Sequence, residues 1–247
     1  MAEFLNQEKL PGEVRQNFPS YLDKMLDCHG RNVLSVSIYG SAAGGDYRFK
    51  KSDINSVFIF QELSFETFKT SLNVVARGKR QRISVPLFLA KEYLTSSADV
   101  FPIEFLDMKE NHICVHGEDI LASLEIKEEH LRLLCEQQIK GKLLRIRQAY
   151  LEIGIQNKQI EGILKESLRA LIPVFRNLIR LKGKTPPVHK GEIIQLICSE
   201  FQLREDVLGP VLKWTRADEK ISRKEIAVYL EKYLEEMAKL AKEVDKL

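Results

Sequence analysis

The chain has 247 residues, of which 44% are hydrophobic and 30% are charged. This composition is ordinary for a soluble globular protein, and the length suffices for one large or two modest domains with a real core. The net charge is only +3, because 38 Lys and Arg nearly balance 35 Asp and Glu, so charge alone does not indicate a nucleic-acid partner.

Membrane and secretory segments are not indicated. No apolar run approaches the roughly 20 residues that a membrane span needs, and the N-terminal segment MAEFLNQEKLPGEV lacks the basic and apolar regions of a signal peptide. We therefore expect a cytoplasmic protein without a membrane partner. The four cysteines, Cys28, Cys114, Cys135 and Cys198, show no C-x-x-C spacing, so reduced, buried thiols are favoured over a zinc site or a disulfide framework.

The first predicted elements are a helix over residues 20–28, which Gly30 ends, and a strand over residues 33–38. A second strand over residues 57–60 is uniformly apolar, as expected when both faces of a sheet are covered. Ser64 can cap a helix that runs to Ala76. One side of that helix is apolar and consists of Phe65, Phe68, Leu72 and Val75.

A basic segment, residues 77–82, precedes a third predicted strand over residues 83–89. No aromatic residue interleaves its charges, so a solvated turn is favoured over a phosphate contact. Residues 102–108, PIEFLDM, are predicted to form a further strand. An acid within an apolar strand is costly unless it is paired or bound to a metal, which makes Glu104 a functional candidate. It is preferred to Asp107, which would face the other side, and an edge glutamate pointing into water is the alternative.

Two histidines invite a metal-ligand interpretation. His112 and His116 would share one face of an extended segment, but no further ligand completes a set nearby. Surface or turn histidines are therefore favoured.

From about Lys127 onward, apolar residues recur every three or four positions, which predicts an all-α helical bundle. Pro173 should kink the second helix or remove one of its hydrogen bonds. The predicted domains are residues 1–125 and 126–247. The predicted helices cover residues 127–153, 157–181, 189–201 and 205–213, and a last one begins at Ser222.

The central motif spans residues 37–60, SIYGSAAGGDYRFKKSDINSVFIF. An apolar strand runs into the Gly40-Ser41 turn, and Ser52-Asp53-Ile54-Asn55 opens the next strand. Small residues in a turn leave backbone N–H groups accessible to an anion, and a carboxylate at a strand mouth suits a hard cation. The motif therefore predicts a phosphate site beside a cation site.

The order and spacing of these residues resemble the nucleotidyltransferase fold of the DNA polymerase beta superfamily. Its signature is G-S, a spacer, and D-x-D or D-x-E at the start of the next strand. The segment is most similar to bacterial aminoglycoside nucleotidyltransferases. The resemblance implies an α/β (α+β) nucleotidyltransferase domain with a mixed sheet, followed by an all-α helical bundle. It also implies transfer of an NMP, namely AMP from ATP or a nucleotide from another NTP, to a hydroxyl acceptor with one or two Mg²⁺ ions.

The resemblance assigns roles to six residues. Residues of the Gly-Ser turn and the serine that precedes Asp53 would bind the nucleotide. The polar residues at the start of the second strand and the acid at position 104 would bind the metal, and that acid is also the candidate general base. Gly40, Ser41 and Ser52 are the nucleotide-binding candidates, Asp53, Asn55 and Glu104 the metal candidates, and Asp53 and Glu104 the catalytic candidates.

One departure from the signature is Asn55, which stands where the second acid is expected. An amide oxygen brings no charge, and hard divalent ions depend on carboxylate charge; Asp46 is a second candidate to supply it. The alternative function is therefore a catalytically impaired protein of the same fold that binds a nucleotide or a protein partner, as an antitoxin-like protein would. The acceptor, a small molecule or a protein, is not identified, nucleic acid is disfavoured, and a homodimer is left open.

Overall fold

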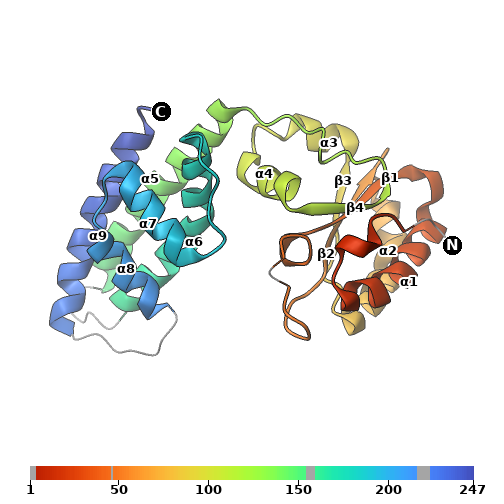
Figure 1. The fold of residues 1–247 in the computed structure, drawn as a ribbon, viewed down its shortest axis with the longest axis horizontal. Helices are drawn as coiled ribbons and strands as arrows, with labels where there is room; N and C mark the ends of the chain where they lie inside the picture. Colours follow the sequence, from red (N-terminus) through yellow and green to blue (C-terminus); the bar gives the residue numbers. More distant parts are fainter. Residues whose placement is uncertain (1–3, 46, 154–158, 216–222) are drawn as a thin grey trace. The chain divides into compact units, whose positions relative to one another are not determined.

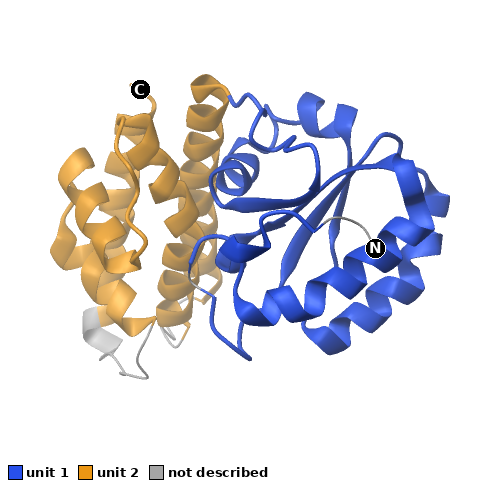
Figure 2. Ribbon diagram, turned by 45° about the vertical axis from the view of Figure 1, so that its right-hand side comes forward, with its two compact units in different colours: residues 1–126 blue, residues 127–247 orange. Residues whose placement is uncertain are grey.

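The computed structural model describes residues 4–45, 47–153, 159–215 and 223–247. The chain divides into unit 1, residues 1–126, and unit 2, residues 127–247, which Figure 2 colours blue and orange. Each unit has its own buried core. The long helices of unit 2 begin directly after the division.

Unit 1 is a small sheet with helices on both faces (Figure 1). Its short 3-10 turns are η1 (Gln7–Lys9), η2 (Gly30–Asn32), η3 (Gly40–Ala42) and η4 (Lys79–Gln81). Its strands are β1 (Val33–Tyr39), β2 (Asn55–Phe60), β3 (Leu87–Ala90) and β4 (His112–Gly117). Its helices are α1 (Gly12–His29), α2 (Phe65–Gly78), α3 (Lys91–Ser96) and α4 (Pro102–Glu110).

The four strands form a mixed sheet in the order β3-β2-β1-β4, as predicted. The central strand β1 is antiparallel to β2 and to β4, whereas β3 is parallel to β2. Tyr39, at the end of β1, pairs with Asn55 of β2 and with His112 of β4. The Gly40 turn, the first residue of β2 and the first residue of β4 therefore lie together at one end of these strands.

Strand β2 is buried on both faces, which confirms the prediction from its unbroken apolar run. Phe58 and Phe60 lie in the core formed with α1 and α2. Val57 and Ile59 belong to the opposite core, which also contains residues of α3 and α4. Side chains alternate across a strand, so one apolar strand supplies the centre of both layers.

Two predicted strands are corrected by the structure. Residues 102–108 are not a strand but most of α4, and the edge strand β4 follows them. Pro102 occupies the first turn of that helix, where its fixed φ suits a helix and its missing N–H would have no partner in any case. The third strand is shorter than predicted, because Ile83 forms only an isolated bridge with Ile54 and Pro86, which cannot donate a ladder hydrogen bond, precedes β3.

Helix α2 begins with the cap that was predicted. The Ser64 side chain accepts a hydrogen bond from the Thr67 backbone N–H, and the Thr67 side chain accepts one from the Ser64 N–H. These two bonds satisfy donors that a helix start otherwise leaves open. The side of α2 that faces the core, however, consists of small or polar residues: Thr67, Ser71, Val74 and Gly78.

Unit 2 is an all-α bundle in which the predicted apolar stripes are buried. Pro173 lies inside α6, and the Asn177 side chain donates to its carbonyl oxygen at 2.9 Å. The start predicted at Ser222 lies outside the described residues. None of the described helices is long and apolar enough to cross a membrane. The helices are α5 (Glu128–Ile153), α6 (Ile160–Leu181), α7 (Lys190–Phe201), α8 (Glu205–Trp214) and α9 (Arg223–Val244).

The cysteines differ sharply in accessibility. All four are free thiols, and Cys114, Cys135 and Cys198 are buried as expected, whereas the expectation of a buried thiol is wrong for Cys28, which is exposed. Burial raises the pKa of the Cys135 and Cys198 thiols to about 12, so almost no reactive thiolate is present at neutral pH. We expect a thiol reagent to label Cys28 of the native protein at least about 100-fold faster than the other three, which should react only on unfolding. Mass spectrometry of the labelled peptides measures this, and rapid labelling of Cys135 in the folded protein would contradict the buried position.

Candidate functional site

The turn after β1 has the backbone geometry that the motif predicts. Gly40 has a φ of +75°, a conformation that glycine adopts without strain and that other residues rarely adopt. Its N–H donates to the Asn111 carbonyl oxygen at 3.2 Å, and its own carbonyl oxygen accepts from the Gly44 N–H at 2.8 Å. The turn is thus fixed from both sides, with Ser41 half-buried in its middle.

Asn55 is held directly against this turn. A Cβ atom added at Gly40 would lie 3.3 Å from Asn55 Nδ2, which is closer than a side chain normally tolerates. The other end of the amide, Oδ1, accepts a hydrogen bond from Ser84 Oγ at 2.8 Å. Asn55 therefore links the turn, the start of β2 and the segment before β3.

Asp53 is paired with a cation of the basic segment. Its Oδ1 atom lies 3.5 Å from Arg82 Nη2, and the aspartate side chain is 63% exposed. The Arg82 guanidinium also donates to the Lys50 carbonyl oxygen. An exposed pair of this kind adds little stability, so either partner is available to a charged ligand.

Ser52 closes the loop that precedes Asp53. Its hydroxyl accepts from the Arg48 N–H at 3.0 Å, and its N–H donates to the Arg48 carbonyl oxygen at 2.9 Å. The same loop is attached to α1, because Tyr47 donates its hydroxyl to Glu13 Oε2 at 3.0 Å. Burial and the neighbouring Glu13 carboxylate raise the pKa of Tyr47 to about 12. Ser52 thus stabilises the loop through two hydrogen bonds with the Arg48 backbone.

Glu104 does not join this group. It lies exposed in the first turn of α4, and within the described ranges no hydrogen bond or ion pair connects it to Asp53 or Asn55. A glutamate in the first helical turn is stabilised by the helix dipole, which gives this acid a structural explanation. Its predicted metal and general-base roles stay predictions.

The histidines of β4 have structural contacts. His112 Nε2 lies 2.7 Å from Asp119 Oδ1, and His112 Nδ1 lies 2.9 Å from the Lys109 carbonyl oxygen. His112 thereby connects the end of α4 with the loop after β4. His116 is half-buried further along the strand.

The side chains at the strand mouth do not fit a two-ion centre. Across the part of the chain that the structure describes, no three His, Cys, Asp or Glu side chains gather closely enough to hold a metal ion. Asp53 has a cation as its neighbour, and Asn55 offers an uncharged oxygen that already accepts a hydrogen bond. Mg²⁺ is usually held through one or two carboxylates together with substrate phosphates, and a two-ion centre needs such ligands for both ions. Asp46, the second candidate to supply the charge, lies outside the described residues.

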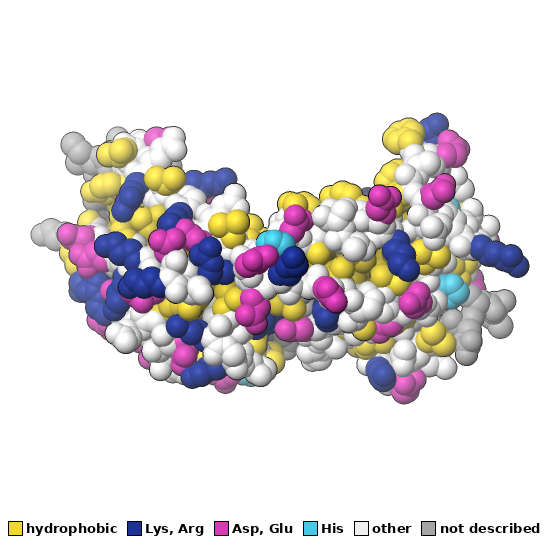
Figure 3. Space-filling model, turned by 90° about the horizontal axis from the view of Figure 1, so that it is seen from above, with side chains coloured by type: hydrophobic (Ala, Val, Ile, Leu, Met, Phe, Trp, Pro, Cys, Tyr) yellow, Lys and Arg dark blue, Asp and Glu magenta, His cyan; other side chains and the backbone are white. Residues whose placement is uncertain are grey.

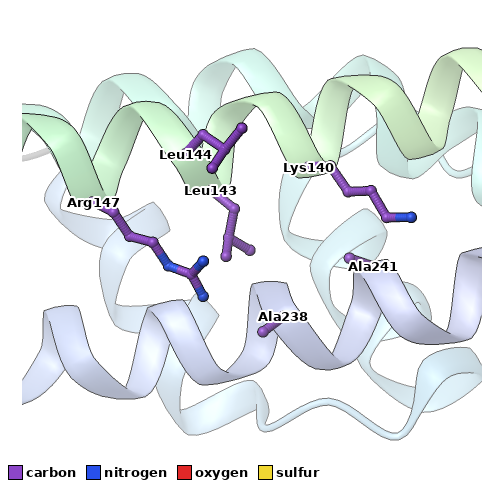
Figure 4. Close-up of a pocket in the computed structure, with 6 residues that line it drawn as sticks. All are labelled: Lys140, Leu143, Leu144, Arg147, Ala238 and Ala241. Atoms are coloured by element: carbon purple, nitrogen blue, oxygen red, sulfur yellow. The ribbon is translucent and has the colours of Figure 1, made fainter.

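Unit 2 carries a shallow apolar groove between α5 and α9 (Figure 4). Leu143 points toward Ala238 there, Leu144 and Ala241 also line the groove, and Lys140 and Arg147 lie at its two ends. The Lys140 ammonium pairs with Glu136 and lies 3.8 Å from Asp245 Oδ1. Its charge is therefore largely compensated, and the groove offers no group of convergent polar side chains of the kind that fixes a small ligand.

The structure adds site residues that sequence patterns did not indicate. The sequence predicts a solvated turn that includes Arg82 and a strand that includes Ser84, and it indicates no site role for Asn111. All three reach the turn or the strand mouth through pairing between segments that are distant in sequence, such as the bridge between Ile54 and Ile83. A single sequence carries no signal for such pairing.

We compared the chain with known proteins. No protein-family model and no curated protein sequence matches it. Among solved structures, the crystal structure of spectinomycin adenyltransferase AAD(9) from Enterococcus faecialis with ATP and spectinomycin is similar, with a TM-score of 0.53 and 10% sequence identity. The match covers 89% of this chain and 97% of that chain. The chain has a nucleotidyltransferase-like fold. At this low identity, the likeness shows the fold alone.

Proposed function

We propose that this protein binds a nucleoside triphosphate, ATP or another NTP, at the Gly40-Ser41 turn. The observation that supports this most directly is the positive φ of Gly40. Its turn packs against Asn55, where the end of β1 meets the starts of β2 and β4. Such a turn presents backbone N–H groups and a serine hydroxyl to phosphate oxygens. The similarity to a fold solved elsewhere with ATP supports the same ligand class.

Cations lie close enough in sequence and space to complement a triphosphate. Arg82 reaches Asp53 and the Lys50 carbonyl oxygen, and Arg48, Lys50 and Lys51 are exposed on the loop before the strand mouth. Guanidinium groups bind phosphate through paired hydrogen bonds. In this proposal, Arg82 exchanges the exposed carboxylate of Asp53 for phosphate oxygens.

Isothermal titration calorimetry with ATP, GTP, CTP and UTP tests the proposal. We expect at least one nucleotide to bind with a dissociation constant between about 1 μM and 1 mM. Arg82→Gln should weaken binding about 10-fold, the effect of losing a charged hydrogen bond, whereas Arg80→Gln in the same basic segment should leave it unchanged. Absence of heat with all four nucleotides would refute the proposed function.

Nucleotidyl transfer is the second candidate function. The similarity to an adenyltransferase structure favours it, and Asp53 keeps one acid of the signature at the strand mouth. The acceptor would be a hydroxylated small molecule or a protein in the cytoplasm. Against transfer stand the neutral Asn55 and the position of Glu104 on α4. The set of carboxylates that would hold the metal ions is incomplete, so the geometry supports nucleotide binding better than nucleotidyl transfer.

A nucleic-acid partner is not part of the proposal. On the face shown in Figure 3, basic and acidic side chains are interspersed and do not separate into one basic stripe. Backbone recognition of nucleic acid depends on clustered Lys and Arg. The few basic residues near the strand mouth could neutralise one triphosphate, whereas a nucleic-acid backbone would require a larger basic surface.

A further inference from the structure

Helix α2 turns its largest apolar side chains away from the core. Phe65, Phe68 and Leu72 recur at helical spacing and are 74%, 43% and 64% exposed. Three such neighbours form a continuous apolar surface, unlike the single exposed residues that are common on proteins. We call these three residues the α2 stripe.

The α2 stripe lies over the edge of the sheet. The core-facing side of α2 contacts α1, where Ser71 Oγ and His29 Nε2 are 2.7 Å apart. On the stripe side, the Phe68 ring stacks on the Phe88 ring of β3, with centroids 6.0 Å apart and planes 24° apart. The apolar side of α2 therefore lies above the edge strand β3.

Strand β3 has an open and uncharged edge. It is the first strand in the order β3-β2-β1-β4, and among the described residues no strand pairs with its outer side. Its residues, Leu87–Ala90, carry no charge, and Val85 just before it is 64% exposed. Edge strands are normally protected by charges or by a covering segment. An uncharged edge beside an apolar helix side favours a partner that supplies a strand and an apolar helix together.

A second copy of this chain supplies both. A twofold axis perpendicular to the sheet beside β3 would pair the two β3 strands antiparallel and place the two α2 helices side by side on the same face. The helices would also be antiparallel, so Phe65 of one copy would meet Leu72 of the other. The Phe68 and Phe88 rings of both copies would then lie at the centre of one interface.

The charges beside the α2 stripe are compatible with self-association. The Lys69 ammonium lies 5.3 Å from the centroid of the Phe65 ring, and its Nζ lies 3.3 Å from Glu66 Oε2 on the same helix. Two copies would therefore bring no unpaired charge together. A neutral stripe does not favour a strongly charged protein or an anionic membrane surface, both of which attract unpaired cations.

We propose that unit 1 forms a homodimer through the α2 stripe and the outer edge of β3. Sedimentation velocity of the full chain from about 0.1 to about 100 μM should show a dimer, because these concentrations bracket a dissociation constant of about 1 μM. Phe65→Glu with Leu72→Glu should weaken dimerisation at least about 100-fold, because it would bury unpaired carboxylates in the apolar contact between the two α2 helices. Leu133→Glu with Leu151→Glu, on exposed positions of α5, is the matched control and should remain dimeric.

Cysteine cross-linking tests the geometry with uncharged substitutions at the same two positions. In a Cys28→Ser background, Phe65→Cys with Leu72→Cys should form an intermolecular disulfide on mild oxidation. The two positions are seven residues apart on one helix, about 10 Å, which is too far for a bond within one chain. A monomer at every concentration, a dimer that survives the double glutamate change in a folded protein, or a dimer that fails to cross-link would each overturn the proposal. So would binding of a monomer to anionic lipid vesicles through the α2 stripe.

Discussion

Replacing Asn55 with aspartate is expected to raise Mg²⁺-dependent ATP consumption by about 10²–10³-fold, the scale on which one electrostatic donor alters a rate. Residues 53 and 55 point to the same side of an extended segment, so the variant would place two carboxylates at the strand mouth. Ser84 Oγ, which donates to Asn55 Oδ1 at 2.8 Å, can donate equally to a carboxylate oxygen. The change therefore adds charge while keeping an acceptor for the Ser84 hydroxyl.

Two measurements check this expectation. Pyrophosphate release reports ATP consumption, and titration with Mn²⁺ reports cation binding independently of any reaction. Asn55→Ala is the control, because it also removes the amide but brings no charge. Equal activity in wild type and Asn55→Asp would contradict the prediction. If the wild type already adenylylates an acceptor and Asp53→Ala abolishes that reaction, the natural site is not impaired.

Gly40→Val is expected to abolish nucleotide binding, with the dissociation constant for ATP raised more than about 100-fold, equivalent to about 2.7 kcal/mol. Valine is branched at Cβ and strongly disfavours the φ of +75° found at this position. Its Cβ would also lie 3.3 Å from Asn55 Nδ2. The turn must rearrange to relieve both effects, which moves the backbone N–H groups that the phosphate would contact.

The matched control is Gly30→Ala. Gly30 also has a positive φ, +54°, but an added Cβ meets nothing within 4 Å, and it lies at the opposite end of β1. Both variants should lose about 1–2 kcal/mol of unfolding free energy from the backbone conformation, as urea denaturation measures. Only Gly40→Val should lose ATP binding in calorimetry. Equal loss in both variants would show that stability, not the turn, limits binding.

Local patterns in the sequence predicted the parts of the fold that depend on neighbouring residues. The unbroken apolar run of β2 indicated a strand covered on both faces, and three- and four-residue spacing indicated the bundle helices. The Gly40-Ser41 turn was identified from its small residues. These predictions succeeded because burial determines which neighbouring positions of a strand or helix are apolar, and a tight turn favours small residues.

Predictions failed where local preference was ambiguous. Residues 102–108 were predicted to form a strand from their apolar side chains, but they belong to α4, where Pro102 occupies the first turn. Glu104 therefore occupies a helical position that was predicted to be in a strand. Strand alternation therefore no longer supports a site role for Glu104. The fold itself is the one expected.

The sequence by itself determined that a Gly-Ser turn precedes Asp53 between two apolar strands, and that Asn55 stands where the second acid of the signature is expected. Only the tertiary structure decided what surrounds them: Arg82 beside Asp53, Ser84 on Asn55, and an apolar helix side over an open strand edge. The physical reason is that these contacts join segments whose pairing is set by the whole sheet. Spacing along one segment cannot specify them.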